Sequence, residues 1–267
     1  MNVGRGMIDE QKIERDGIIE EIAEYWNTRI HDAELSKHEP GTLGFFDDLD
    51  EYHFDKLNYL PEMVDYDGYA GKKVLDVACG IGTDLARFAK GGAEATGIDL
   101  SEKAIGLATK NFELRGLKGD FRVMNGEALD FPDESFDMVF AHGALQYTAD
   151  TQKMADECRR VLKPGGELIA QLYNRKGWLI FMSKFAKVKL EHDDAPAFKL
   201  FTIDEFKHFL RDFSEAEITP TRFPVKSRLH KGLKGFLFNT FFVGGFNILP
   251  RSWVRRWGWH LMARAVK

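Results

Sequence analysis

The sequence of 267 residues has only two cysteines and no long apolar run. Cys79 and Cys158 form no CxxC pair, so neither a disulfide framework nor a cysteine-based metal site is expected, and we predict no metal. Such sparse cysteine usage is typical of a reducing cytoplasm. The opening MNVGRGMIDE lacks the apolar core of a signal peptide. The sequence also has no run of about 18 apolar residues, so no membrane-spanning helix is predicted.

Acidic residues are missing from the C-terminal part of the chain. Ile218–Lys267 has ten of the 37 basic residues and no Asp or Glu, which leaves Met1–Glu217 with 27 basic residues, 42 acidic residues and a net charge of −15. The same C-terminal stretch has six Phe and three Trp. Because the acidic body repels phosphates and no nucleic-acid-binding module is recognisable, a nucleic-acid partner is not expected.

Short apolar runs alternate with helical patterns from Lys73 to Tyr173. The runs KVLDVA, AEATGIDL, DFRVM, FDMVFA and ELIAQLY predict strands, and segments such as TDLARFAK and SEKAIGLATKNFEL between them predict helices. This alternation predicts an α/β fold with a parallel sheet. Farther along, SEAEITPTRF and GWHLMARAV predict an antiparallel pair of strands.

The predicted organisation is a helical cover over residues 1–68 followed by one domain over residues 69–267. Ile18, Ile22, Tyr25 and Trp26 recur at helical spacing and give a first helix one apolar face. Two segments are predicted to be insertions on the substrate side, an irregular stretch at 174–200 and a basic, aromatic stretch at 223–257. Between them, FTIDEFKHFLRDF predicts a helix with a capping box of Thr202 and Glu205.

The stretch VLDVACGIGTD joins a predicted strand to a glycine turn and a helix, which is typical of a nucleotide-binding site. Gly80 and Gly82 match the first two glycines of GxGxxG, but Leu85 occupies the third position, which counts against a dinucleotide. Asp99 ends the second predicted strand and is placed to accept hydrogen bonds from ribose hydroxyls. These residues indicate adenosine binding without naming the cofactor.

Four motifs in order extend this signal: VLDVACGIGTDL, GIDLS, NGEALDFPDESFDMVFAHGALQY and RRVLKPGGELI. Together they resemble the class I S-adenosylmethionine-dependent methyltransferases, particularly the ubiquinone and menaquinone (type 11-like) group, over about Tyr69 to Tyr173. The resemblance implies a Rossmann-like seven-stranded sheet that is mostly parallel, with an antiparallel last strand and helices on both faces. It also implies that the cofactor is S-adenosylmethionine and that the product is S-adenosylhomocysteine.

The resemblance implies contacts to the methionine and ribose parts of the cofactor. The backbone at Ala78, Gly80 and Gly82 would lie against the methionine, and Asp76 would orient its ammonium group. Ala78 stands where the family usually has glycine, and we expect its methyl group to be tolerated if its backbone angle is ordinary. The other residues predicted on this side are Asp99 at the ribose, Ala141 at the ammonium through its carbonyl, Cys79 and Thr83.

On the adenine side, Leu100 would pack on the base and Asn125 would meet its amino group, with Gly126 and Glu127 along its edge. Several of these residues also have a purely structural explanation. Asp76 and Asp99 are also suited to capping a helix, and Cys79 to filling core space. Asn125-Gly126 is equally a turn sequence.

Methyl transfer from a sulfonium starts from an activated donor, so the protein must position two reactants and needs a base only for a protonated acceptor. His142, Tyr147 and Tyr173 follow predicted strands and are candidate catalytic residues. Each is also explained by a purely structural role. His53 and His192 lie in segments expected to fold over the same edge.

Tyr25 and Trp26 are predicted to cover the sulfonium, because aromatic faces favour cations, with core packing as the alternative. The 223–257 insertion is suited to a membrane surface, a lid over a lipophilic acceptor, a homodimer face or a small aromatic core. We therefore predict methylation of O, N or C on a small, hydrophobic acceptor such as a phenol, quinol or lipid. The alternatives are an NAD(P)-dependent oxidoreductase and a non-catalytic cofactor-binding or membrane-surface protein.

Overall fold

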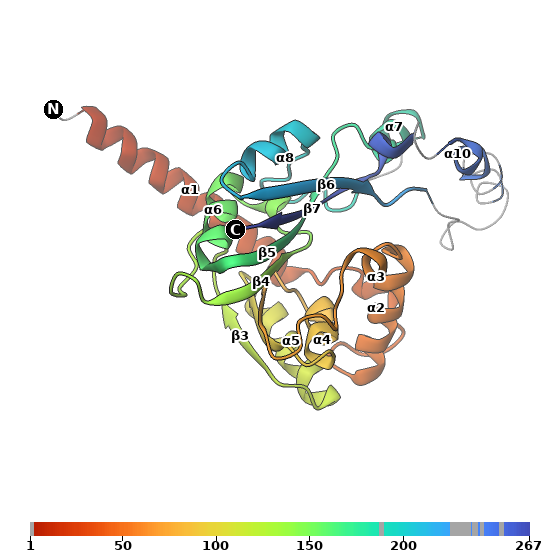
Figure 1. Ribbon diagram of the computed structural model, residues 1–267, viewed down its shortest axis with the longest axis horizontal. Coiled ribbons are helices and arrows are strands. Elements are labelled where there is room, and N and C mark those ends of the chain that lie inside the picture. Colours follow the sequence, from red (N-terminus) through yellow and green to blue (C-terminus); the bar gives the residue numbers. More distant parts are fainter. Residues whose placement is uncertain (1–2, 187–189, 225–235, 237–239, 241–242, 251–253) are drawn as a thin grey trace.

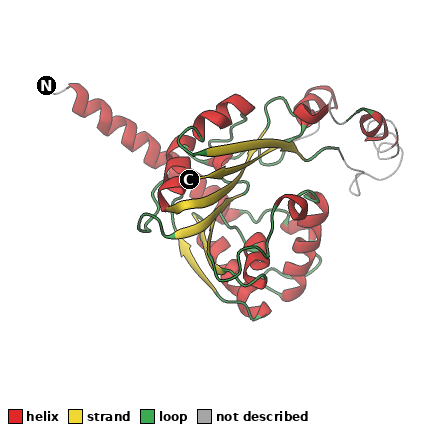
Figure 2. Cartoon of the chain, in the orientation of Figure 1, coloured by secondary structure: helices red, strands yellow, loops and turns green. Residues whose placement is uncertain are grey.

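The computed structural model describes residues 3–186, 190–224, 236, 240, 243–250 and 254–267. A seven-stranded sheet forms its centre, with helices on both faces (Figures 1 and 2). The elements in chain order are α1 (Val3–Thr28), η1 (Ala33–Leu35), α2 (Leu43–Lys56), α3 (Leu60–Met63), β1 (Lys73–Val77), α4 (Thr83–Lys90), β2 (Glu94–Asp99), α5 (Glu102–Arg115), β3 (Gly119–Val123), β4 (Phe136–Ala141), η2 (Leu145–Tyr147), α6 (Thr151–Val161), β5 (Leu162–Tyr173), α7 (Trp178–Ala186), α8 (Ile203–Phe209), β6 (Glu215–Thr221), α10 (Gly244–Ile248), η4 (Arg255–Trp257) and β7 (His260–Val266).

The strand order is β3-β2-β1-β4-β5-β7-β6, and the first five strands are parallel. β7 lies antiparallel between β5 and β6, with Tyr173 and Thr221 both opposite His260. The predicted Rossmann-like sheet with an antiparallel last strand is therefore confirmed. Because β6 is antiparallel to β7, it ends at the same edge as β1, β2, β4 and β5, and β7 begins there.

The sheet is buried on both faces, which explains why its central strands are almost continuous apolar runs. Val74, Leu75 and Val77 of β1 are each at most 1% exposed. One core cluster packs α6 and α8 against one face, and a second packs α3 and α4 against the other. Full burial of one Leu or Phe side chain in these clusters stabilises the folded chain by about 1.5–3 kcal/mol relative to an exposed side chain.

Four of the described helices, α2, α5, α6 and α8, begin at a residue whose side chain caps the helix. Ser101 at the start of α5 accepts a hydrogen bond from the backbone N–H of Ala104. The predicted capping box of Thr202 and Glu205 is present at α8. These bonds satisfy backbone N–H groups that have no partner inside the helix.

The segment 174–200, predicted as irregular, instead contains the helix α7. Its sequence WLIFMSKFA is apolar almost throughout and lacks the polar face by which a surface helix is recognised. Much of the predicted 223–257 insertion lies outside the described residues. Within the described part of the chain, no helix has both the length and the apolar character needed to cross a membrane.

Candidate functional site

A cavity of about 260 Å³ opens at the edge where the parallel strands end. It is bordered by the turn after β1, by the ends of β2, β4 and β5, and by α1 and α2 of the N-terminal part. Fourteen of the residues predicted from the sequence line it: Trp26, Asp76, Ala78, Cys79, Gly80, Thr83, Asp99, Leu100, Asn125, Gly126, Glu127, His142, Tyr147 and Tyr173. Three do not line it: Tyr25, Gly82 and Ala141.

The turn after β1 has three left-handed residues, Ala78 (φ 59°), Gly80 (φ 54°) and Gly82 (φ 77°). The condition under which the methyl group of Ala78 was expected to be tolerated, an ordinary backbone angle, is therefore not met. A residue with a Cβ is strained in this region by about 1–2 kcal/mol, and Gly at this position would relieve the strain. Gly82 caps α4 and packs against α5, where an added Cβ would meet Phe112 at 3.3 Å.

Asp99 is held by the turn and by the start of α5. Its Oδ2 accepts from the N–H of Gly80 at 3.0 Å, and its Oδ1 accepts from the N–H of Ser101 at 2.9 Å. Burial raises the pKa of this carboxyl despite these hydrogen bonds. Each carboxylate oxygen has a further lone pair, so a fixed acceptor for a pair of hydroxyls faces the cavity. The structural role at the helix start and a binding role are thus compatible.

Asp76 has a different environment, because its side chain is only 4% exposed and no hydrogen bond to its carboxylate is present in the described residues. Burial, together with the charges of Asp84 and Asp99, raises its pKa well above the usual value. It does not cap a helix there. A buried carboxylate at the wall of a cavity is suited to a cationic partner such as an ammonium group, which would restore its ionised form.

Asn125 and Glu127 form the wall beyond β3. Oδ1 of Asn125 accepts from the N–H of Glu127 at 2.9 Å, so the Asn-Gly turn predicted as an alternative is present. Glu127 is 1% exposed, and its Oε1 accepts from the hydroxyl of Thr148 and from the N–H of Asp150. Its buried Oε2 has no hydrogen-bond partner among the described residues. An acceptor remains here for an exocyclic amino group of a base.

His142 follows β4 and is connected to residues that the sequence did not single out. Its Nε2 lies 3.1 Å from the hydroxyl of Tyr59, which lies 2.6 Å from Nδ1 of His260. Arg222 contacts the other side of His260, with 3.0 Å from Nη1 to Nε2. Burial, helped by the charges of His53 and Arg222, lowers the pKa of His142 to about 3. His142 is therefore neutral at physiological pH.

His53, predicted to fold over this edge, does so from α2. Its Nε2 lies 3.0 Å from Oδ2 of Asp84, and Asp84 also accepts from the hydroxyl of Tyr66 at 2.6 Å. Burial opposes ionisation of Asp84, but the charge of His53 outweighs it and lowers the pKa of Asp84 to about 2. The two side chains form an ion pair when His53 is protonated.

The two candidate tyrosines pack together at the end of β5. The hydroxyl of Tyr147 donates to that of Tyr173 at 3.3 Å, and their rings meet edge to face. Burial raises the pKa of both. Both remain neutral phenols, so they offer hydrogen bonds and aromatic surface rather than a phenolate base.

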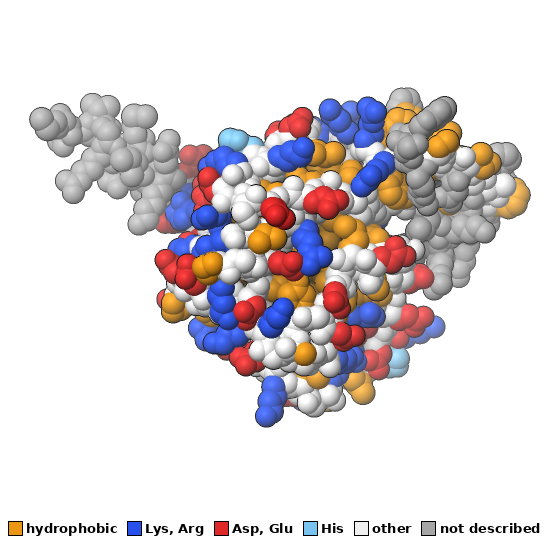
Figure 3. Space-filling view, in the orientation of Figure 1, with side chains coloured by type: hydrophobic (Ala, Val, Ile, Leu, Met, Phe, Trp, Pro, Cys, Tyr) orange, Lys and Arg blue, Asp and Glu red, His pale blue; other side chains and the backbone are white. Residues whose placement is uncertain are grey.

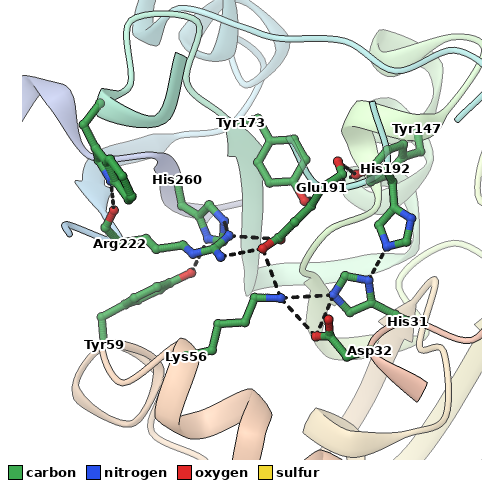
Figure 4. A network of polar contacts seen from close by, with 11 residues as sticks. His31, Asp32, Lys56, Tyr59, Tyr147, Tyr173, Glu191, His192, Arg222 and His260 are labelled. Atoms are coloured by element: carbon green, nitrogen blue, oxygen red, sulfur yellow. Dashed lines mark hydrogen bonds and ion pairs between the residues drawn. The ribbon is translucent and has the colours of Figure 1, made fainter. Parts of the chain in front are cut away.

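Figure 4 shows a polar network that joins segments distant in the sequence. Glu191 accepts two hydrogen bonds from Arg222, at 2.7 and 3.1 Å, and its Oε1 lies 3.2 Å from Nζ of Lys56. Lys56 also donates to Asp32 at 3.0 Å. Each of these four residues lines the cavity. No local motif in the sequence predicted them, because the contacts join residues 32, 56, 191 and 222.

Tyr25 and Trp26 have different positions at the end of α1. Trp26 lines the cavity and packs edge to face on Tyr147, with ring centroids 5.3 Å apart. Tyr25 instead donates to Asp194 at 2.9 Å and contacts His192, which belongs to the same segment as Glu191. The N-terminal cover and residues 191–194 therefore close the cavity together.

Comparisons with known proteins agree with this geometry. Residues 75–170 match the family described as a methyltransferase domain. The chain is 29% identical to a ubiquinone biosynthesis O-methyltransferase of Sinorhizobium medicae, over 64% of this chain and 66% of that protein. It is 34% identical to a protein of the same name from Azoarcus sp., over 56% of this chain and 66% of that protein. The matched part thus spans just under two thirds of these relatives.

Two solved structures share the fold. One is a SAM-dependent methyltransferase of Thermotoga maritima (TM-score 0.51, 19% identity, 82% of this chain and 98% of that chain). The other is the [4+2]-cyclase SpnF (TM-score 0.51, 20% identity, 92% of this chain and 93% of that chain). At this level of identity the likeness concerns the fold. The chain is thus similar to methyltransferase domains in sequence over residues 75–170 and in fold over a larger part of its length.

Proposed function

We propose that this chain binds S-adenosylmethionine in the cavity and transfers its methyl group to a hydroxyl oxygen of a small aromatic acceptor. The observation that carries the proposal is Asp76, a buried carboxylate at the cavity wall that has no hydrogen-bond partner in the described residues. The ammonium group of the cofactor supplies the missing charge. Asp99 would hold the ribose hydroxyls, and Glu127 Oε2 would accept from the adenine amino group. The bound cofactor supplies an activated methyl group.

The class of methyl acceptor that we propose depends on the other residues that line the cavity. Aromatic and aliphatic side chains, Trp26, Tyr147 and Leu57 among them, suit a flat ring. Polar groups, including His142 and Gln171, face the same space, and they suit hydroxyl substituents on that ring. The relatives named ubiquinone biosynthesis O-methyltransferase favour oxygen over nitrogen or carbon as the methylated atom. A phenol or quinol is thus the acceptor class that we propose.

The cofactor assignment is tested by calorimetric titration of S-adenosylhomocysteine and of NADH into wild type and Asp99→Ala. We expect wild type to bind S-adenosylhomocysteine and not NADH. In Asp99→Ala we expect the affinity for S-adenosylhomocysteine to fall about tenfold or more, because hydrogen bonds to a charged group contribute about 1.5–3 kcal/mol. Asp120→Ala, an exposed carboxylate of β3, is the matched control. NADH binding, or unchanged affinity in Asp99→Ala, would overturn the assignment.

The transfer itself is tested with methyl-labelled S-adenosylmethionine and a panel of catechols, quinols, amines and fatty acids, with products identified by mass spectrometry. We expect label on a phenolic oxygen. Cofactor binding without transfer to any member of the panel would favour the non-catalytic alternative.

We also propose that this protein is cytoplasmic and binds peripherally to a membrane surface. Phe181 of α7, Ile248 of α10 and Trp257 of η4 are exposed apolar residues. Figure 3 shows apolar side chains at the end of the molecule where Figure 1 places α7 and α10. Arg255 and Arg256 are exposed beside Trp257 in η4 and would meet anionic lipid. We expect co-sedimentation with anionic but not neutral vesicles, weakened by salt. Absence of binding to anionic vesicles would reject it.

A further inference from the structure

We propose that Tyr59 and His260 lock His142 as a neutral imidazole with its proton on Nδ1, so that His142 donates a hydrogen bond into the cavity rather than acting as the general base. The inference builds on the proposed function, in that the donated bond is directed at a ligand oxygen. It assigns positioning roles to two residues that no sequence motif indicated. The hydrogen-bond chain from Arg222 to His142 carries it.

The direction of the chain is set at Arg222. A guanidinium has only donors, so Nε2 of His260, at 3.0 Å from Nη1, must accept. A neutral His260 then carries its proton on Nδ1. Protonation of both nitrogens would aim an N–H at the guanidinium, and burial beside Arg222 lowers the pKa of His260 well below its usual value. Glu191 and Lys56 also face this ring, and Glu191 pairs with Arg222 without contacting Nε2.

The next step in the chain is Tyr59, whose hydroxyl lies 2.6 Å from Nδ1 of His260. Because that nitrogen donates, the Tyr59 oxygen accepts, and its own proton is free for Nε2 of His142 at 3.1 Å. The other arrangement has Tyr59 accept from both rings. Among the described residues its O–H would then face the hydroxyl of Thr221, with which it has no hydrogen bond of normal geometry, so this arrangement costs about 1–3 kcal/mol. The chain therefore runs from Arg222 through His260 and Tyr59 to His142 (Figure 4 shows its first three members).

With Nε2 of His142 accepting, the remaining proton is on Nδ1. No hydrogen bond to Nδ1 is present in the described residues, and His142 lines the cavity. The groups that face the ring from other elements are Asp84 of α4, His53 and Lys56 of α2, and Arg222 after β6. Asp84 favours a protonated ring and the other three oppose it. A donor at this place would bind an oxygen lone pair, such as that of a phenolate, which needs no base for methylation.

Nuclear magnetic resonance of ¹⁵N-histidine-labelled full-length protein tests the tautomer directly. The His142 signal is assigned by its loss in His142→Gln. Between about pH 6 and pH 8, we expect a neutral ring protonated on Nδ1 in wild type. In Tyr59→Phe we expect a shift toward the Nε2–H form and a higher pKa. Tyr69→Phe is the matched control, because this tyrosine also loses a bond to a side chain, Glu167, away from the cavity.

A wild-type His142 protonated on Nε2, or charged in this pH range, would overturn the proposal whether or not Tyr59→Phe folds. So would an unchanged tautomer in folded Tyr59→Phe. In the methylation assay, we expect an acid limb in the pH dependence of kcat/KM to arise in Tyr59→Phe. A wild-type acid limb that disappears in His142→Gln would instead identify a base. The resonance experiment needs no methyl transfer, so its result is separable from failure of the proposed function.

Discussion

At the scale of single residues, the cofactor side of the cavity contains two features that destabilise the folded chain. Ala78 has a left-handed backbone angle that suits glycine, and Asp76 is a buried carboxylate to which the described part of the chain supplies no counter-charge. Both border the same cavity. Strain and unpaired charge are tolerated where the surroundings fix them and a ligand compensates them.

Ala78→Gly is expected to raise the free energy of unfolding by about 1 kcal/mol, because glycine adopts φ near +60° without a clash. Ala86→Gly is the matched control, since Ala86 lies in α4 and the same change there should lower stability by about 1 kcal/mol. Urea denaturation measures both. Equal destabilisation by the two variants would contradict the conformation described for the turn.

Asp76→Asn is expected to raise the stability of the ligand-free protein at pH 7 and to lower the affinity for S-adenosylhomocysteine about tenfold or more. The folded-state pKa of Asp76 is raised, so the folded chain binds more protons than the unfolded chain. Its contribution to stability is therefore lost as pH rises from about 4 through the folded pKa. Denaturation at several pH values and calorimetry measure the two effects. Reduced stability together with unchanged affinity would contradict the role given to this carboxylate.

At the scale of elements, the start of α5 connects the cofactor turn to the N-terminal cover. Ser101 caps α5 through Ala104, and its hydroxyl lies 3.2 Å from the backbone oxygen of Trp26 and 3.0 Å from Oδ1 of Asn27. The same residue donates its N–H to Asp99. One fully buried residue thus connects α1, α5 and Asp99.

Ser101→Ala is expected to lower the free energy of unfolding by about 1–2 kcal/mol through the lost cap, and to weaken cofactor binding less than Asp99→Ala does. Thr109→Ala is the control, because Thr109 lies on the exposed face of the same helix and its hydroxyl donates to the backbone oxygen of Ile105 within that helix. Thermal denaturation and calorimetry are the measurements. A loss of affinity equal to that of Asp99→Ala would show that Ser101 has more than a structural role.

The elements could be predicted from the sequence wherever a pattern is local. Buried strands are continuous apolar runs, and the capping box of Thr202 and Glu205 is a four-residue signal. The helix α7 was missed because its nearly uniform apolar sequence has no helical periodicity. The angle at Ala78 was missed because only the residue type, and not its backbone conformation, is visible in a sequence.

At the scale of the whole molecule, the polar network that borders the cavity is assembled from distant segments. Lys56, Glu191 and Arg222 come from α2, from the loop before α8 and from the end of β6. Their contacts depend on the sheet order and not on any motif. This explains why the sequence indicated cofactor-side residues near one turn, yet indicated neither this network nor Tyr59 and His260.

Glu191→Gln is expected to lower the free energy of unfolding by about 2 kcal/mol at pH 7, because Arg222 and Lys56 lose their shared counter-charge. Burial opposes ionisation of Glu191, but the charges of Arg222 and Lys56 outweigh it and hold its pKa well below the usual value. The stabilisation is thus present above about pH 4.5 and is lost as pH falls through the folded pKa. The difference from wild type should therefore diminish in acid.

Denaturation of both proteins across this pH range is the measurement, with Glu94→Gln, an exposed residue of β2, as the control. We also expect faster proteolysis of the N-terminal cover in Glu191→Gln. A stability difference that persists unchanged in acid would show that charge is not the cause.

The position of β7 has a consequence for how the chain is made. β7 is synthesised after β6, yet it lies between β5 and β6 and brings His260 to the cavity. During translation β6 has no neighbour in the sheet, and β5 keeps an open edge. Open edges favour pairing between molecules. The nascent chain is therefore most prone to aggregation just before β7 emerges from the ribosome, when its cavity also lacks one wall.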